Sequence, residues 1–182
     1  MLMNRENSLL LIIDIQERLT PAMDSAREVI TNSTKLVELA NELKVPFIIN
    51  EQYPKGLGST MFDIKSKAGE KANYIEKISF SSGKDEATLK AIKKTKKKQI
   101  IIAGIETHIC VLQSAIDLKE AGYEVFLVAD ACSSRAREQN IFGLQRMMQN
   151  GIQIVTFEMV FFEWFEKAGS PEFKELSKKL VK

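Results

Sequence analysis

The chain has 182 residues, of which 45% are hydrophobic and 27% charged, and its formal net charge at pH 7 is +2. This length and apolar content suffice for one domain, residues 1–182, that buries about 70% of its unfolded surface without metal or disulfide staples. The net charge is too small to imply a nucleic-acid or membrane partner. Two cysteines, no apolar leader and no long apolar run predict a reducing compartment, and we expect the cytoplasm.

Short apolar runs alternate with segments of helical periodicity along the chain. The runs are typical of buried parallel strands, and they predict strands over residues 8–14, 45–50, 73–77, 99–104, 123–128 and 152–156. Helical spacing of apolar residues predicts helices over residues 25–43, 85–94, 107–121, 134–149, 157–165 and 171–180, the fourth of them capped by Ser134. The stretch 51–72 is too long for a plain connection, so we expect it to be functional or to carry short structure.

This alternation predicts an α/β fold, a three-layer, doubly wound, six-stranded parallel sheet with helices on both faces. In such sheets the ligand site lies beyond the carboxyl ends of the strands, near the point where strand order reverses. Polar residues at the predicted strand ends are therefore the functional candidates. They are Asp14, Asn50, Glu51, Lys77, the turn that contains Cys110, and Asp130.

Cys110 follows the fourth predicted strand across a tight turn at Gly104. A thiolate near the first turn of a helix is stabilised by free N–H groups and by the helix dipole, which makes Cys110 the best candidate nucleophile. The alternative is that Cys110 is a small apolar residue packed under the helix. An acid, an amine and a thiol are each costly to bury unpaired. A meeting of Asp14, Lys77 and Cys110 at one sheet edge would explain all three.

Three segments resemble the signatures of the isochorismatase-like cysteine hydrolases, relatives of nicotinamidase and N-carbamoylsarcosine amidase. These segments are Leu-Ile-Ile-Asp-Ile-Gln at 11–16, Ile-Glu-Lys at 75–77 and Gly-Ile-Glu-Thr-His-Ile-Cys-Val at 104–111. Three others are similar to the branch called isochorismatase domain-containing proteins, at 50–58, 77–80 and 130–135. The order and spacing of these segments match the family over nearly the whole chain.

The resemblance implies a doubly wound sheet and a catalytic triad of Asp14, Lys77 and Cys110. It also implies a cis peptide bond between Ile105 and Glu106, and an oxyanion site formed by the backbone N–H groups of Glu106 and Cys110. Further residues are expected to contact the substrate, namely Gln16, Glu51, Tyr53, Phe80 and Thr107.

The chemistry of these residue types fits hydrolysis. Asp14 would accept the thiol proton of Cys110, while Lys77 would favour the thiolate and orient Asp14. Attack on a carbonyl carbon would then expel an amine, and water would hydrolyse the resulting thioester with Asp14 as the base. We therefore predict a cysteine hydrolase that cleaves a small amide-like C–N bond.

Nicotinamidases carry an aspartate and histidines as metal ligands after the second strand. Residues 50–58 of this chain contain no histidine, so we expect no metal and no cofactor. The expected partners are a small-molecule substrate and further copies of the chain in a homo-oligomer, with no nucleic acid and no membrane. The aromatic cluster at 161–165 is expected to form a buried helix face or a subunit contact.

Two other classes of protein stay open. One is a catalytically silent binding or scaffolding protein on the same fold, and the other is a nuclease, suggested only by the lysine run at 93–98. A base at His108 is disfavoured because a residue two positions from Cys110 on a helix points about 200° away. Asp130 and Arg135 are expected to pair with each other or with the turn backbone, and Cys132 to be a packing residue.

Overall fold

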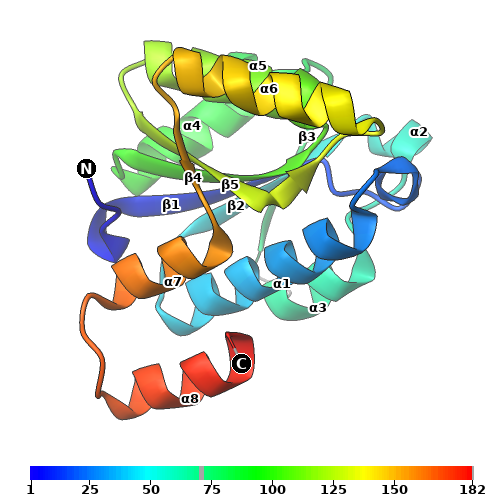
Figure 1. The fold of residues 1–182 in the computed structure, drawn as a ribbon. Coiled ribbons are helices and arrows are strands. Elements are labelled where there is room, and N and C mark those ends of the chain that lie inside the picture. The colour runs from blue at the N-terminus through cyan, green and yellow to red at the C-terminus, as the bar shows by residue number, and fades with distance from the viewer. Residues whose placement is uncertain (70–71, 182) are drawn as a thin grey trace.

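The computed structural model describes residues 1–69 and 72–181. The strands pair in parallel throughout, in the order β3-β2-β1-β4-β5-β6. Their bounds are β1 Ser8–Ile13, β2 Phe47–Gln52, β3 Asn73–Lys77, β4 Gln99–Ile105, β5 Glu124–Ser133 and β6 Gln153–Val155. The predicted six-stranded parallel sheet is confirmed (Figure 1).

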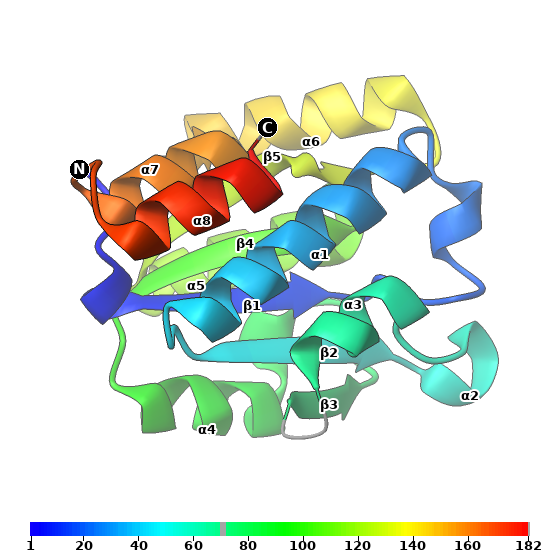
Figure 2. The same ribbon diagram turned by 90° about the horizontal axis from the view of Figure 1, so that it is seen from below.

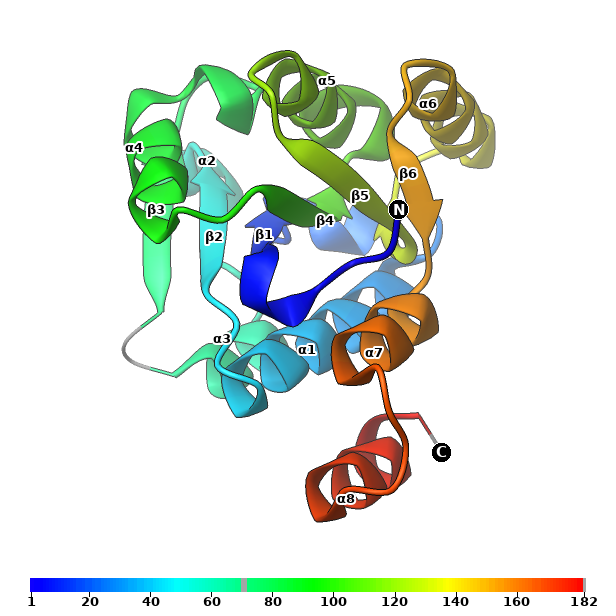
Figure 3. The ribbon, with the colours of Figure 1, turned by 90° about the vertical axis from the view of Figure 1, so that its left-hand side faces the viewer.

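The α-helices cover both faces of this sheet. Their bounds are α1 Ala26–Glu42, α2 Pro54–Leu57, α3 Phe62–Ala68, α4 Glu86–Thr95, α5 Leu112–Glu120, α6 Arg137–Gln149, α7 Phe157–Phe165 and α8 Pro171–Leu180. Helices α1, α3 and α7 lie on one face and α4, α5 and α6 on the other, with α8 outside α1 and α7 (Figure 3). These are the three layers that the alternation of strands and helices predicts.

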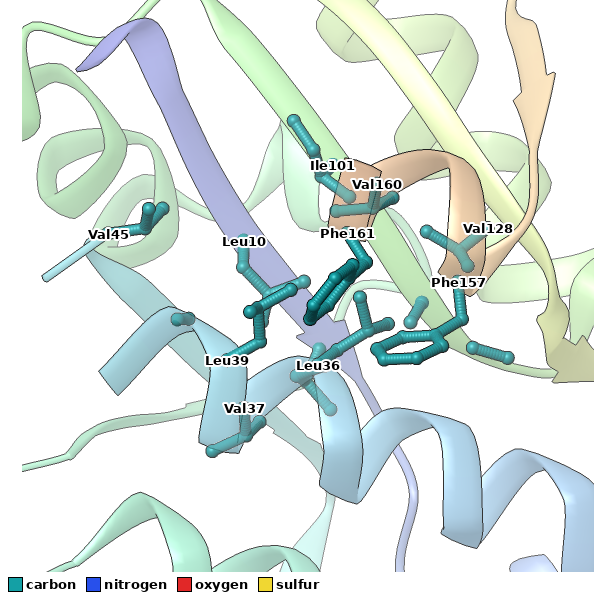
Figure 4. Close-up of a cluster of buried hydrophobic side chains, with 14 of the residues drawn as sticks. Leu10, Leu36, Val37, Leu39, Val45, Ile101, Val128, Phe157, Val160 and Phe161 are labelled. Atoms are coloured by element: carbon teal, nitrogen blue, oxygen red, sulfur yellow. The ribbon is translucent and has the colours of Figure 1, made fainter. Parts of the chain in front are cut away.

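A separate hydrophobic core fills the space on each face of the sheet. Side chains alternate along a strand, so in β1 Leu10 and Ile12 point to the face of α1, whereas Leu9 and Leu11 point to the face of α5. Figure 4 shows Leu10 beside Phe161 of α7 in the first of these cores. Because β1 is buried on both faces, its sequence is an unbroken apolar run.

Strand order reverses between β1 and β4. From β1 the chain proceeds outward through β2 to β3, and it then returns to the other side of β1 as β4. This reversal leaves the carboxyl ends of β1 and β4 side by side, at the point where doubly wound sheets bind ligands. Figure 2 shows β1 and β2 running toward the edge of the molecule where α2 lies.

The observed end of the fifth strand differs from the sequence prediction. Strand β5 continues to Ser133, so Asp130 lies inside this strand and not after it. The cause is a shift of register, since Ile102 of β4 pairs with Leu127 whereas Gly104 pairs with Cys132. The stretch 51–72 carries short structure, since α2 and α3 lie within it.

The predicted serine cap of the helix over 134–149 is wrong. Helix α6 begins at Arg137, and its N-cap residue is Ala136, which makes no side-chain cap hydrogen bond. Ser134 instead lies at the end of β5, where its hydroxyl is 2.8 Å from Nδ1 of His108. A tertiary partner therefore replaces the local cap that the sequence pattern predicts.

Candidate active site

An acid and an amine meet inside the protein at the carboxyl edge of the sheet. Asp14 directly follows β1, and Lys77 is the last residue of β3. Nζ of Lys77 donates to Oδ2 of Asp14 at 2.7 Å, and both side chains are fully buried. The other carboxylate oxygen, Oδ1, is buried and has no hydrogen-bond partner within residues 1–69 and 72–181. One oxygen of Asp14 is thus held by the cation, and the second remains available as a proton acceptor.

The ammonium of Lys77 has further acceptors around it. Oε1 of Gln52 lies 2.8 Å from Nζ, and the backbone carbonyls of Phe80 and Ser79 lie at 3.1 Å and 3.3 Å. An ammonium carries three N–H donors, so Lys77 is fully hydrogen bonded in its charged form. Lys77 can therefore supply positive charge at the site but has no lone pair with which to act as a base.

Gln52 is the contact to this ammonium that the sequence analysis missed. It ends β2, and the register of β2 against β3 places it directly beside Lys77. A signal for it exists in the sequence, since two parallel strands that end together bring their last side chains to the same edge. Finding Gln52 required the register, which the apolar pattern alone does not give.

Cys110 lies in the turn that joins β4 to α5. This turn, Thr107–Val111, is π-helical, so the predicted helix over 107–121 begins as a wider turn and becomes α-helical at Leu112. The backbone N–H groups of Ile109 and Val111 both donate to the carbonyl of Glu106, at 3.0 Å and 3.3 Å. The Cys110 side chain is buried, with the residue 6% exposed.

Gly104 allows β1 and β4 to approach closely enough to bring Asp14 and Cys110 together. Its φ is +150°, and a Cβ at this position would lie 2.2 Å from the carbonyl oxygen of Ile13. Only glycine tolerates both that backbone angle and that contact. The residue before Asp14 therefore packs directly against the strand that leads to the nucleophile.

Burial controls the protonation of the acid and the thiol. It raises the pKa of Asp14 to about 6, although the charge and hydrogen bond of Lys77 act to lower it. Burial also raises the pKa of the Cys110 thiol to about 12, with a further increase from the Asp14 charge and an opposing effect of Lys77. At pH 7 these shifts favour a protonated thiol at Cys110 and a carboxylate at Asp14. Desolvation thus opposes the expected stabilisation of a thiolate and outweighs the favourable effect of Lys77.

The peptide bond between Ile105 and Glu106 is cis. Burial alone would raise the pKa of the Glu106 carboxyl, but hydrogen bonds from Arg135 more than offset it and hold this pKa below its usual value. Both the backbone N–H and Nε of Arg135 donate to Glu106, at 2.9 Å and 3.1 Å. The sequence predicted that Asp130 and Arg135 pair with each other or with the turn backbone, and the side chain of Arg135 instead binds Glu106. Oδ1 of Asp130 instead accepts the N–H of Phe157 at 2.8 Å.

Two of the residues expected to contact substrate hold the loop between β2 and α3. Nε2 of Gln16 donates to the carbonyls of Gln52 and Gly58, at 3.0 Å and 2.7 Å, and its Oε1 accepts the Gln52 N–H at 2.7 Å. Oε1 of Glu51 accepts both the N–H and the hydroxyl of Thr60, at 2.6 Å and 2.7 Å. Both side chains therefore position the backbone around Gln52.

The other residues that the sequence predicts for the site differ in their exposure to solvent. Tyr53 and Phe80 are 52% and 56% exposed, and both flank Lys77 through their backbones. Thr107 is buried, and its hydroxyl has no partner among the described residues. Ile105 packs into the core on the face of α1. A hollow of about 300 Å³ lies beside this region, lined by Tyr53, Pro54, Lys55, Glu76, Lys77 and Ile78.

His108 and Cys132 both lie among side chains that belong to the packing around β5. The ring of His108 contacts the hydroxyl of Ser134, in the connection between β5 and α6. Cys132 is buried, and its burial raises the pKa of its thiol to about 12. Among residues 1–69 and 72–181, no group of three or more His, Cys, Asp or Glu side chains could hold a metal ion. In the same part of the chain, no helix combines the length and apolar character that a bilayer span requires.

The fold and this site together define a doubly wound α/β protein with an acid, an amine and a thiol at the reversal of strand order. Residues 8–159 match the family model of the isochorismatase domain. The chain therefore belongs to the isochorismatase family, and its fold is that of the family's hydrolases. This confirms the resemblance seen in the sequence.

Curated relatives match over nearly the whole chain. Isochorismatase family protein 1A of Dictyostelium discoideum is 39% identical over 173 residues, which cover 93% of this chain and 84% of the relative. Isochorismatase domain-containing protein 2 of Danio rerio is 35% identical over 179 residues, which cover 98% of this chain and 89% of the relative. The similarity to the isochorismatase domain-containing proteins thus extends far beyond the short motifs.

Solved structures of similar proteins superpose closely on this chain. MAR1 ribonuclease from Caenorhabditis elegans is 35% identical, with a TM-score of 0.93 and coverage of 100% of this chain and 93% of that chain. The YcaC gene product of Escherichia coli, described as an octameric hydrolase of unknown specificity, is 26% identical, with a TM-score of 0.91 and coverage of 98% and 90%. YcaC from Pseudomonas aeruginosa, which holds covalent acrylamide, is 25% identical, with a TM-score of 0.91 and coverage of 98% and 91%.

Proposed function

We propose that this protein is a cysteine hydrolase that cleaves a small amide-like C–N bond through a thioester intermediate. The observation that carries this proposal is the buried ion pair of Asp14 and Lys77 beside Cys110. Lys77 binds one oxygen of Asp14 at 2.7 Å, and the second oxygen has no partner among the described residues. That carboxylate lies close enough to Cys110 for each group to act on the other's pKa. Membership of a hydrolase family supports the same reading.

Attack by Cys110 is coupled to proton transfer in this proposal. Because burial raises the pKa of the thiol to about 12, little free thiolate exists at neutral pH. The thiol proton moves to Oδ1 of Asp14 as the bond from Sγ to the substrate carbonyl carbon forms. The carbonyl π electrons move to oxygen, and the backbone N–H groups of Glu106 and Cys110 are the proposed donors to that oxyanion. Lys77 remains cationic and stabilises negative charge on whichever of the other two groups carries it.

The second half of the reaction restores the site. Collapse of the tetrahedral species breaks the C–N bond, and the nitrogen leaves with the proton held by Asp14. Asp14, again a carboxylate, then takes a proton from water as the water oxygen attacks the thioester carbon. The acid product leaves, and the proton returns to Sγ. Every proton in this sequence passes through one carboxylate.

Two structural neighbours support the proposal and extend it. Covalent acrylamide in the Pseudomonas YcaC protein is evidence for a nucleophile in that relative, since acrylamide is an electrophile that thiols attack. The octameric Escherichia coli protein supports a homo-oligomer here. Exposed apolar side chains on α6 and α7, Phe142, Met148 and Phe162, are suitable for subunit contacts. We propose a cytoplasmic homo-oligomer that acts on a small molecule and needs no metal or cofactor.

A panel of small amides, ureas and carbamoyl compounds tests the activity. Turnover found with the wild-type protein is expected to be abolished in Cys110→Ala and retained in Cys132→Ala, because Cys132 takes no part in the proposed chemistry. Circular dichroism checks that both variants are folded. Full turnover by Cys110→Ala would reject the mechanism. Absence of turnover and of thiol reactivity in the wild type would favour the scaffolding alternative.

The ribonuclease name of the Caenorhabditis neighbour makes nuclease activity the second candidate. The geometry gives it little support. The lysines at 93–98 lie at the end of α4 and immediately before β4, so they are at the amino edge of the parallel sheet. The triad lies at the carboxyl edge. A nucleic acid held by those lysines would therefore be on the far side of the sheet from Cys110. RNA cleavage that is lost in Cys110→Ala would favour the nuclease over the amidase.

A further inference from the structure

Gln52 forms a bridge between the catalytic lysine and the backbone that follows it. Its Oε1 accepts from Nζ of Lys77 at 2.8 Å, and its Nε2 donates to the carbonyl of Ile78 at 2.7 Å. The two contacts use the opposite ends of one amide, so the acceptor end is turned toward the ammonium. Gln52 is thereby held in one orientation by the same strand end that carries Lys77.

The backbone of Gln52 is fixed as well. Gln16 accepts the N–H of Gln52 at 2.7 Å and donates to its carbonyl at 3.0 Å. In the sheet, Gln52 of β2 pairs in register with Lys77 of β3. The amide is therefore preorganised at both its main chain and its side chain, which an incidental surface contact would not require.

Charge distinguishes the two side chains that hold the ammonium. Asp14 is anionic and Gln52 is neutral, and both accept from Nζ at short distance. A carboxylate in place of Gln52 would share the single positive charge between two anions. Two carboxylates that share one site cannot both stay ionised easily, and one of them retains a proton. A neutral acceptor avoids this competition.

We propose that Gln52 is a positioning residue of the triad, which holds the Lys77 ammonium against Asp14 and leaves its positive charge undivided for that carboxylate. This inference rests on the proposed function, since it concerns the readiness of Asp14 to take the Cys110 proton. Gln52 need not touch substrate in this role. It acts through Lys77.

The ionisable groups around Asp14 and Cys110 determine which residues a new charge at position 52 would affect. Asp14 is influenced by Lys77 from β3 and by Cys110 from the π-helical turn. Cys110 is influenced by both of these and by Glu106. The charge of Glu106 is paired with Arg135. A second carboxylate at position 52 would therefore act first on Lys77 and Asp14.

The pH dependence of Cys110 alkylation by acrylamide tests the proposal without knowledge of the substrate. In this addition, Sγ bonds to the terminal alkene carbon and a proton ends on the neighbouring carbon. The rate is measured by intact-protein mass, with peptide mapping to separate Cys110 from Cys132. For the wild type, the rate is expected to rise through pH 6, where Asp14 ionises. For Gln52→Glu, the midpoint is expected to move upward by one pH unit or more.

Two further variants complete the design. Gln52→Met keeps the length and neutrality of the side chain but removes the acceptor, and it is expected to slow alkylation roughly tenfold or more through loss of positioning. Gln99→Glu is the matched control. Gln99 is also hydrogen bonded at a strand end, but it is buried, whereas Gln52 is half-buried, and it lies at the start of β4, on the edge of the sheet opposite the triad. This control is expected to leave the midpoint unchanged.

The outcomes separate the inference from the function on which it rests. If wild-type Cys110 reacts no faster than Cys132, the proposed function fails. If wild-type Cys110 reacts with the expected profile but Gln52→Glu shows the same midpoint, the role of Gln52 is overturned and the nucleophile stands. If Gln52→Glu does not fold, Gln52→Met decides, and an unchanged rate in that variant overturns the proposal.

Discussion

At the scale of single residues, burial creates a conflict between stability and reactivity at Asp14. The ordinary pKa of 3.8 is raised to about 6 in the fold, chiefly by desolvation. A carboxyl group whose pKa is raised on folding stabilises the native state fully below its unfolded pKa, and this contribution is lost as the pH rises through the folded pKa. The proposed base, however, must be ionised to act. The site therefore works in the pH range where its own acid opposes folding.

Lys77 offsets part of this cost, because its charge and its hydrogen bond stabilise the ionised Asp14 carboxylate. Lys77→Met is expected to destabilise the protein by about 3 to 5 kcal/mol at pH 8, because it leaves the Asp14 carboxylate buried without its cation. Loss of Lys77 raises the pKa of Asp14 further, so at pH 5 the acid takes up a proton and the cost is smaller. Urea unfolding at the two pH values, followed by the fluorescence of Trp164, measures the difference.

A surface lysine provides the control for this experiment. Lys84 pairs with Asp117 at 3.5 Å, but its side chain is 72% exposed. Lys84→Met is therefore expected to cost less than about 1 kcal/mol at either pH. Equal costs of Lys77→Met at pH 5 and pH 8 would contradict the assignment of Asp14 as the group that titrates.

The sequence identified Asp14, Lys77 and Cys110 as candidates because each follows or ends a buried strand or its turn. It did not identify the protonation state of the thiol, since the depth of burial depends on helices that are distant in sequence. The same limit explains the pairing of Glu106 with Arg135, two residues that are 29 positions apart and meet only through the fold. Gln52 was missed because register between strands is a tertiary property.

At the scale of elements, the close contact between β1 and β4 sets the geometry of the site. Gly104→Ala is expected to destabilise the protein by about 3 kcal/mol or more, through a strained backbone angle and a clash with the Ile13 carbonyl. Because a separation of the strands would also move Asp14 from Cys110, acrylamide labelling of Cys110 is expected to slow. Thermal unfolding and labelling rates measure the two effects.

Gly69→Ala is the matched control for that substitution. Gly69 has a φ of +74°, and a Cβ there would meet no atom within 4 Å among the residues that the structure describes. The backbone angle alone is expected to cost about 1 to 2 kcal/mol, without an effect on labelling. If Gly104→Ala behaved in the same way as Gly69→Ala, close packing of β1 on β4 would not be what positions the triad.

Element identity was more predictable than element boundaries. Apolar runs such as 99–104 predicted strands correctly because a strand buried on both faces has to be apolar throughout. The extension of β5 to Ser133 was missed because the register shift against β4 inserts polar residues such as Asp130 into the strand. A polar residue in a run ordinarily indicates its end.

At the scale of the whole molecule, both cores share one sheet. Residues of β1, β4 and β5 contribute to the core on the face of α1 and, alternately, to the core on the face of α5. Each layer of helices covers one face of this shared sheet (Figure 3). We propose that residues 1–182 form one domain that unfolds cooperatively.

The fluorescence of Trp164, which is buried in α7 and donates to Ser8 at 3.1 Å, reports the α1 face. Circular dichroism at 222 nm reports the helices on both faces. The two signals are expected to change together in one urea transition. Separate midpoints would show that the two layers unfold independently and would contradict a single domain.

The chain contains a single histidine, and the fold places it two residues from the candidate nucleophile. His108 belongs to the π-helical turn, and its ring contacts Ser134, which follows β5. The chemical shifts of its ring protons therefore depend on the structure of both segments. Its imidazole resonances in a proton NMR spectrum need no assignment by mutagenesis. The molecule thus carries a built-in spectroscopic reporter, through which a compound bound at Cys110 could be detected before any reaction is known.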